Sequence, residues 1–98
     1  MKVTVVYTMK GCPYCVQIKE ELQKNDILFI ERDIYEYEDE YNEFVKITNN
    51  DYVPSLMLMT ISDVEQSETA ENVKFLAPER DYKDIFEGVE IVKNYLLD

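Results

Sequence analysis

The chain of 98 residues contains two cysteines, Cys12 and Cys15, which are separated only by Pro13 and Tyr14. A disulfide between them would close a very short loop, and the chain-entropy stabilisation of a disulfide falls as its loop shortens. Stapling the fold is therefore a poor explanation for this spacing. The spacing fits thiol–disulfide exchange, in which one thiolate attacks a disulfide and a second thiol resolves the mixed disulfide that forms.

The residues after the first cysteine predict a helix that begins at Pro13. Cys15, Ile18 and Leu22 fall on one face, and most of the positions between them are polar. Proline suits the first position of a helix, so Cys12 is predicted to cap it. A sulfur at the cap lies beside free backbone N–H groups and the positive end of the helix dipole, and both stabilise a thiolate. We therefore expect Cys12 to attack and Cys15 to resolve.

The elements that position this helix follow from the hydrophobic pattern. Lys2–Thr8 is rich in β-branched residues and predicts a buried strand, and Ile27–Ile34 predicts a second strand. A helix between two strands favours a parallel pair, so residues 2–34 are expected to form a β-α-β unit. Asn25 is expected to end the helix in the left-handed conformation.

The rest of the chain completes the order β-α-β-α-β-β-α, which predicts an α/β fold with helices packed on a small sheet. No repeat, low-complexity tract or linker interrupts it, so residues 1–98 are expected to form a single domain. The predicted elements are a helix with Tyr41, Phe44, Val45 and Thr48 on one face; a strand Pro54–Ile61; a polar turn Ser62–Asn72; a short strand Val73–Ala77; and a helix from Asp81 that directs Tyr82, Ile85, Phe86, Val89, Val92 and Leu96 inward.

The charge of the chain is strongly uneven. The formal net charge is −11; residues 1–30 contribute +1 and residues 31–98 contribute −12. This balance disfavours nucleic acid and anionic membrane surfaces as partners. Solubility explains an acidic surface. The alternative is that the cysteine segment lacks excess negative charge because it must admit an anion or stabilise a thiolate.

Other features set the expected location and weigh against other uses of the cysteines. No apolar run approaches the roughly 18 residues of a membrane span, and the first residues predict a strand rather than a signal peptide. We therefore expect a cytoplasmic protein whose thiols stay reduced or cycle. Zinc needs four ligands, and two cysteines with no histidine do not supply them, so no metal is expected. Two inert core cysteines are the remaining alternative, which the surface turn between Gly11 and Pro13 disfavours.

Two segments of the chain resemble the glutaredoxin family. "YTMKGCPYCVQIKEEL" looks like the family's first strand, active-site turn and first helix, with Cys-Pro-Tyr-Cys intact, and "YVPS" resembles its Thr-Val-Pro segment, whose proline is cis. The resemblance implies a thioredoxin-like fold, with a four-stranded mixed sheet and helices on both faces. It also implies glutathione-dependent reduction of protein disulfides or glutathione mixed disulfides, with Cys12 as the nucleophile and Cys15 as the resolving thiol.

The resemblance also implies a glutathione site. Pro54 would face the cysteines, the backbone of Val53 would pair with the cysteinyl unit of glutathione, and Tyr52 stands where the family usually has Thr. The family's Gly-Gly-x-x-Asp segment is absent, and "APERDYKD" occupies its place. The other positions that the resemblance assigns are Lys10 and Gln17 for the glycyl carboxylate, Tyr14 beside the groove, Asp81 for the α-amino group and Arg80 for the γ-glutamyl carboxylate.

Three functions are consistent with these residues. The first is a monomeric dithiol glutaredoxin that acts on disulfide-containing proteins, with ribonucleotide reductase among the family's known targets. The second is a thioredoxin-like donor recharged by a flavoprotein reductase. The third is an iron–sulfur carrier in which Cys12 and glutathione from two subunits hold one cluster; Pro13 and Tyr14 disfavour it, because such members usually have a small residue beside the first cysteine.

Overall fold

The computed structural model describes residues 2–64 and 67–97, which follow the order β-α-β-α-β-β-α. The order confirms the predicted α/β fold. Among the described residues, no helix has the length and apolar character that crossing a membrane requires. The elements are β1 (Lys2–Thr8), α1 (Pro13–Lys24), β2 (Ile30–Asp33), α2 (Glu38–Thr48), β3 (Ser55–Val64), β4 (Ser67–Leu76) and α3 (Ile85–Leu97).

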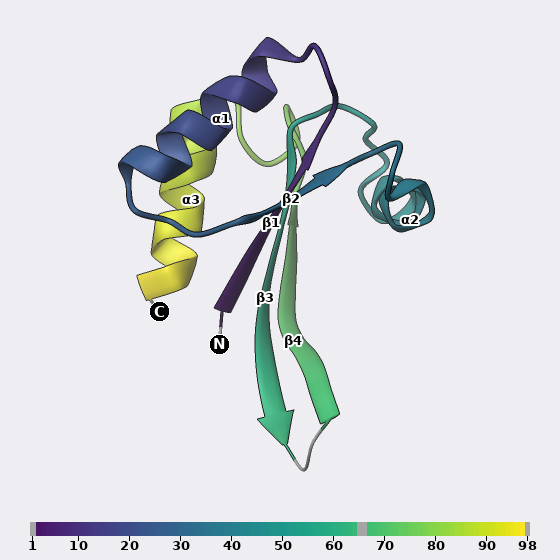
Figure 1. Ribbon diagram of the computed structural model, residues 1–98, viewed down its shortest axis with the longest axis vertical. Coiled ribbons are helices and arrows are strands. Elements are labelled where there is room, and N and C mark those ends of the chain that lie inside the picture. The colour runs from purple at the N-terminus through teal and green to yellow at the C-terminus, as the bar shows by residue number, and fades with distance from the viewer. Residues whose placement is uncertain (1, 65–66, 98) are drawn as a thin grey trace.

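The four strands form one mixed sheet in the order β2-β1-β3-β4 (Figure 1). β1 pairs with β2 in parallel, with Val5 opposite Ile30, as the helical connection between them predicts. β3 is antiparallel to both β1 and β4. This arrangement places the end of β1, which leads into Cys12, beside the start of β3, which follows Pro54.

Helices cover both faces of the sheet, with α1 and α3 on one side and α2 on the other (Figure 1). Successive side chains of a strand point to opposite faces. Val6 therefore packs in the core cluster under α1 and α3, whereas Tyr7 packs in the cluster under α2. Tyr7 lies 5.8 Å from Tyr41 and 5.4 Å from Phe44, measured between ring centroids. Both cores fix β1, and thereby the turn that carries the cysteines.

The prediction of a polar turn over Ser62–Asn72 is wrong, because most of that segment is strand. β3 continues to Val64 and β4 begins at Ser67, with Ile61 opposite Ala70; residues 65 and 66 lie outside the described residues. β1 pairs with β3 only as far as Thr60. Beyond that residue, β3 and β4 project from the sheet as a two-stranded ribbon (Figure 1). Backbone hydrogen bonds pair the strands of such a ribbon, and its sequence lacks the apolar alternation from which a strand is predicted.

The second strand is shorter than predicted, since β2 begins at Ile30 rather than Ile27. Ile27 is buried in the core, and its apolar character reflects that burial rather than strand pairing. The residue in the left-handed conformation after α1 is Asp26, with φ of 57°, and not Asn25, whose φ is −95°. Asn25 instead donates its side-chain amide to the Glu21 carbonyl at 2.8 Å.

The last helix begins at Ile85 and not at Asp81. The Asp84 carboxylate accepts the Glu87 N–H at 2.8 Å, and the Glu87 carboxylate accepts the Lys83 N–H at 3.0 Å. Asp84 therefore caps the start of the helix, and the Glu87 side chain reaches back to the N–H of the residue before the cap. Phe86, predicted to point inward, is 69% exposed. It lies in the first turn of the helix, outside the cluster of buried residues beneath α1 and α3.

Candidate active site

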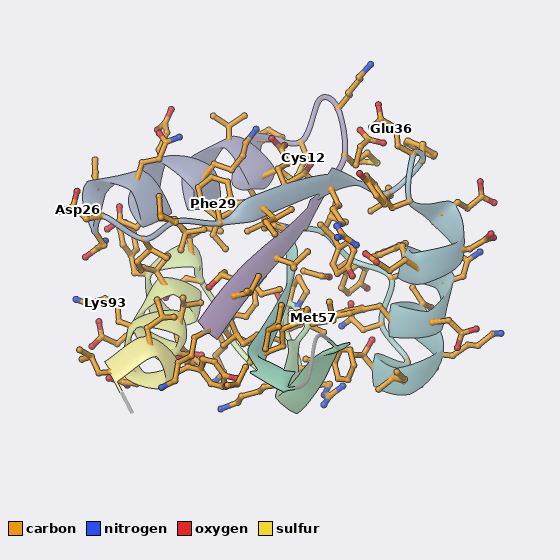
Figure 2. All side chains as sticks on the ribbon, turned by 60° about the horizontal axis from the view of Figure 1, so that its bottom comes forward. Cys12, Asp26, Phe29, Glu36, Met57 and Lys93 are labelled. Carbon is orange, nitrogen blue, oxygen red and sulfur yellow. The ribbon has the colours of Figure 1, made fainter. Side chains whose placement is uncertain are left out.

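Cys12 caps α1 as predicted (Figure 2). Its Sγ accepts the backbone N–H of Cys15 at 3.2 Å, and its carbonyl accepts the N–H of Val16 at 3.3 Å. Gly11 precedes it with φ of +79°, a conformation that glycine adopts without steric cost, so the chain can turn sharply from β1 into the helix. The sulfur therefore sits among the unsatisfied N–H groups of the helix start, where a thiolate is stabilised.

Cys15 lies one helical turn further on and is almost fully buried, with 2% of its surface exposed. Burial and, to a smaller extent, the hydrogen bond with Cys12 raise the pKa of the Cys15 thiol to about 12. The Cys15 sulfur is therefore a protonated thiol at neutral pH. Both cysteines are free, so the structure represents the reduced state of the pair.

The Val53–Pro54 peptide bond is cis, which confirms the prediction from the "YVPS" segment. Cys12 Sγ lies 4.0 Å from the Val53 carbonyl oxygen, so the cis-proline loop and the cysteine turn face each other. The Ser55 hydroxyl donates to the Tyr52 carbonyl at 2.7 Å and ties the loop from within. The loop is thus a fixed wall beside the sulfur of Cys12.

Tyr82 supports this wall, a role that the sequence did not reveal. Its hydroxyl donates to the Pro54 carbonyl, and the side chain is buried. The ring also lies against Gly88, where an added Cβ would stand 3.1 Å from the ring. From the sequence, Tyr82 was expected only as an inward-facing core residue. The sequence signal for this contact is Gly88, because a glycine inside a helix indicates close packing against a neighbour.

One hollow beside the loop brings together four of the residues assigned to glutathione: Tyr14, Gln17, Val53 and Pro54. We call it the proline groove, and its volume is about 360 Å³. It passes from α1 across the cis-proline loop to the start of α3. Its other lining residues are Pro78, Glu79, Tyr82, Lys83, Asp84, Ile85 and Phe86.

A second hollow, of about 580 Å³, opens on the other side of the cysteine turn and is called here the cysteine groove. Both Cys12 and Cys15 line it, together with Lys10, so the structure places this lysine apart from Tyr14 and Gln17. Its remaining lining residues are Thr8, Met9, Gly11, Pro13, Val16, Lys19, Glu31, Asp33 and Glu36.

Three further residues assigned to glutathione, Tyr52, Arg80 and Asp81, line neither groove. The side chain of Tyr52 is exposed, whereas its carbonyl is bonded within the loop. The Asp81 carboxylate accepts the Ala77 N–H at 2.8 Å and pairs with Arg80 Nε at 3.3 Å. Asp81 and Arg80 therefore hold the connection between β4 and α3. Their role toward glutathione stays a prediction.

Comparison with known proteins identifies the family. The profile of the Glutaredoxin family matches residues 4–60, which is more than half of the chain and includes Cys12, Cys15 and Pro54. The chain belongs to the glutaredoxin family. A comparison with curated protein sequences found no match.

Solved structures share the fold. The thioredoxin-like protein BC3987 is 19% identical, with a TM-score of 0.57 over 93% of this chain and 96% of that one. A mutant of the same protein is 18% identical, with a TM-score of 0.58 over 95% and 97% of the two chains. The family and the thioredoxin-like fold together support thiol–disulfide oxidoreductase chemistry. Glutaredoxins in general take electrons from glutathione and act on disulfide substrates.

Proposed function

We propose that this member of the glutaredoxin family is a glutathione-dependent dithiol oxidoreductase that reduces protein disulfides or glutathione mixed disulfides in the cytoplasm. The observation that carries the proposal is the position of Cys12. Its sulfur accepts an N–H at the start of α1 and lies 4.0 Å from the carbonyl of Val53; Cys12 lines the cysteine groove and Val53 lines the proline groove. Cys12 is more buried than its surface turn predicted, with 9% of its surface exposed, and a substrate disulfide would reach it through the cysteine groove, which it lines.

The reaction proceeds in two exchanges. The Cys12 thiolate attacks one sulfur of the substrate disulfide; a Cys12–substrate disulfide forms and the other substrate half leaves as a thiolate. Cys15 then gives up its proton and attacks the Cys12 sulfur, which forms the Cys12–Cys15 disulfide and releases the second half. The substrate gains two electrons and the cysteine pair loses them. Two glutathione molecules, oxidised to glutathione disulfide, restore the dithiol.

The raised pKa of Cys15 determines the order of the two exchange reactions. A protonated thiol is a poor nucleophile, so Cys15 leaves the first attack to Cys12. Its Sγ is held one turn away, which is within the reach that a disulfide requires. Resolution follows once Cys12 is no longer a thiolate, because the hydrogen bond to Cys12 and the charge on it both contribute to the raised pKa of Cys15.

The proline groove is the proposed glutathione site. The Val53 backbone would pair with the cysteinyl unit, while Tyr14 and Gln17 line the wall formed by α1. Lys10 belongs to the cysteine groove, so its contact with the glycyl carboxylate requires the ligand to bridge the turn. Amide-shift mapping on addition of glutathione tests these assignments: Val53 and Gln17 are expected to shift, and an unchanged spectrum would contradict the site.

Turnover with small substrates tests the activity itself. With glutathione, glutathione reductase and the mixed disulfide of glutathione with 2-mercaptoethanol, we expect glutathione-dependent consumption of NADPH. Cys12→Ser should abolish it, whereas Cys15→Ser should retain part of it, since glutathione can resolve the intermediate. Activity that survives Cys12→Ser would contradict the assignment of the nucleophile.

A thioredoxin-like donor, recharged by a flavoprotein reductase, is the second candidate. It is favoured by the missing Gly-Gly segment and by the engagement of Asp81 with Arg80 and Ala77 rather than with the proline groove. The reduction potential separates the two: we expect a value in the range of about −200 to −230 mV found for glutaredoxins, whereas about −270 mV would favour the second candidate. Ribonucleotide reductase is the protein substrate to test first with either reductant.

A further inference from the structure

Cys12 stands between two hollows of different character. Both cysteines line the cysteine groove, whereas neither lines the proline groove. A disulfide under attack has two halves, one that bonds to Cys12 and one that departs. If the glutathionyl half of a mixed disulfide occupies the proline groove, the cysteine groove, which both cysteines line, is free to receive the protein half. The side chains that line the cysteine groove would then contact the substrate protein, a consequence that rests on the proposed function.

The lining of the cysteine groove holds three carboxylates, Glu31, Asp33 and Glu36, against two lysines, Lys10 and Lys19, so its formal net charge is −1. Glu31 accepts hydrogen bonds from Lys19 at 2.9 Å and from Thr8 at 2.8 Å, which lower its pKa and satisfy its charge. Asp33 and Glu36 have no ion-pair partner in residues 2–64 and 67–97. The Asp33 carboxylate accepts the backbone N–H of Tyr35 at 2.8 Å.

The negative charge continues away from the cysteines. Glu36 also lines an adjoining hollow, shared with Tyr37, Glu38, Asp39 and Glu40 at the first turn of α2. Figure 2 shows Cys12 and Glu36 at the same end of the molecule, with α2 running away from them. A chain that leaves Cys12 through this groove thus meets several carboxylates in succession.

We infer that the cysteine groove receives a positively charged segment of the substrate protein, next to the cysteine that is being reduced. Lysine or arginine side chains on that segment would face Asp33 and Glu36 while the substrate sulfur lies against Cys12. The acidic composition of residues 31–98 then serves substrate choice as well as solubility. Opposite charges that face each other across a solvated surface mainly increase the association rate.

Three peptides test the inference. They share one central cysteine, joined to glutathione as the mixed disulfide, and differ only in flanking residues: lysine, glutamine or glutamate. We expect kcat/KM for release of the peptide thiol to be about tenfold higher for the lysine peptide than for the glutamate peptide at low salt. Because solvated charges are screened within about 3 Å at 1 M salt, the preference should largely disappear there. Equal rates at low salt, or a preference for the glutamate peptide, would overturn the inference.

Matched variants assign the preference to the groove. Asp33→Asn with Glu36→Gln removes two charges from the groove, and should bring the lysine-to-glutamate ratio close to one. Glu20→Gln with Glu90→Gln removes two charges from α1 and α3, outside the groove, and should leave the ratio high. Equal losses in both pairs would overturn the inference in favour of the net charge of the whole chain.

The mixed disulfide of glutathione with 2-mercaptoethanol, whose leaving half is uncharged, separates this inference from the proposed function. The Glu20→Gln with Glu90→Gln variant, which lies outside both grooves, should reduce it at the wild-type rate, and for each variant the rate on this substrate is the reference by which its peptide rates are divided. Loss of this basal rate in the unmodified protein would contradict the proposed function. A normal basal rate without any charge preference among the peptides would contradict only the role of the cysteine groove.

Discussion

At the scale of single residues, the two cysteines owe their different chemistry to position. Cys12 ends a turn and meets free N–H groups, while Cys15 is enclosed between α1 and the sheet. The two thiols therefore experience opposite influences. The helix start favours the charged form of Cys12, and burial disfavours the charged form of Cys15. A three-residue step along one helix is enough to separate an attacking thiol from a resolving one.

The buried state of Cys15 predicts its response to alkylation. Burial is the largest cause of the raised pKa of Cys15, and it remains in the Cys12→Ser variant. Iodoacetamide should therefore leave Cys15 of the folded variant unmodified at pH 7 to 9. Its reaction should begin only as the pH approaches the raised pKa. The same variant unfolded in guanidinium chloride is the control, and should react like free cysteine. Rapid alkylation of the folded variant at pH 8 would contradict the buried thiol.

The hydroxyl of Tyr82 predicts a second residue effect. Tyr82→Phe keeps the ring against Gly88 but leaves the Pro54 carbonyl without its donor, and an unsatisfied buried acceptor costs about 1–3 kcal/mol. Urea unfolding should show a loss of stability in that range. Amide shifts of Val53 and Ser55 should also change, since the hydroxyl holds the loop that they flank. Unchanged stability would show that the bond contributes nothing.

At the scale of elements, the helix that follows the cysteines and the strand that precedes them were predictable from sequence. β1 has a continuous β-branched run, and α1 has both an apolar face and Pro13 at its first position. These signals are local, so sequence alone specifies them. The cis bond before Pro54 was predictable only through the family resemblance, because no local signal distinguishes it from an ordinary strand-start proline.

The errors have a common physical cause, which is that hydrophobic pattern reports burial rather than backbone pairing. Ile27 is apolar because it is buried, although it precedes β2. The ribbon of β3 and β4 beyond Thr60 is the reverse case: it is paired but carries a polar sequence. The start of α3 has a separate, local cause, because the side chains of Asp84 and Glu87 cap the helix there.

The two grooves could not be derived from sequence, because each combines residues from distant elements. The proline groove joins α1, the segment around Pro54 and the start of α3, and the cysteine groove joins β1, α1 and β2. The family resemblance assigned Lys10 and Gln17 together to the glycyl carboxylate. The structure places Lys10 in the cysteine groove and Gln17 in the proline groove, which only the folded backbone determines.

Packing between α3 and the loop before it predicts the effect of Gly88→Ala. In an exposed helix this change stabilises by about 1 kcal/mol. Here the new methyl group would lie 3.1 Å from the ring of Tyr82, which is buried and held by its hydroxyl, so overpacking costs about 1–3 kcal/mol and should outweigh the gain. Urea unfolding should therefore show no gain or a net loss. Stabilisation by 1 kcal/mol would mean that the ring can move aside.

At the scale of the whole molecule, the raised pKa of Cys15 links stability to pH. A group whose pKa is higher in the folded state holds its proton there while the unfolded chain loses it. Stability of the reduced protein should therefore fall as pH rises above about 9, the ordinary value, toward about 12, by about 1 kcal/mol per pH unit.

The reduced Cys15→Ser variant is the control for this slope. Burial also raises the pKa of Tyr7 and of Tyr82, and the variant keeps both tyrosines. Their contribution to alkaline destabilisation should thus remain, while the part due to Cys15 disappears. Denaturant midpoints at pH 8, 9 and 10 measure both slopes. Parallel slopes for the two proteins would contradict the assignment to Cys15.

The most direct test of the central claim, that Cys12 attacks and Cys15 resolves, is mass spectrometry of the single-cysteine variants after brief exposure to glutathione disulfide at pH 7. We predict that Cys15→Ser gains one glutathionyl group, on Cys12, and that Cys12→Ser gains none over the same time. Modification of Cys15 at a rate equal to or above that of Cys12 would contradict the account.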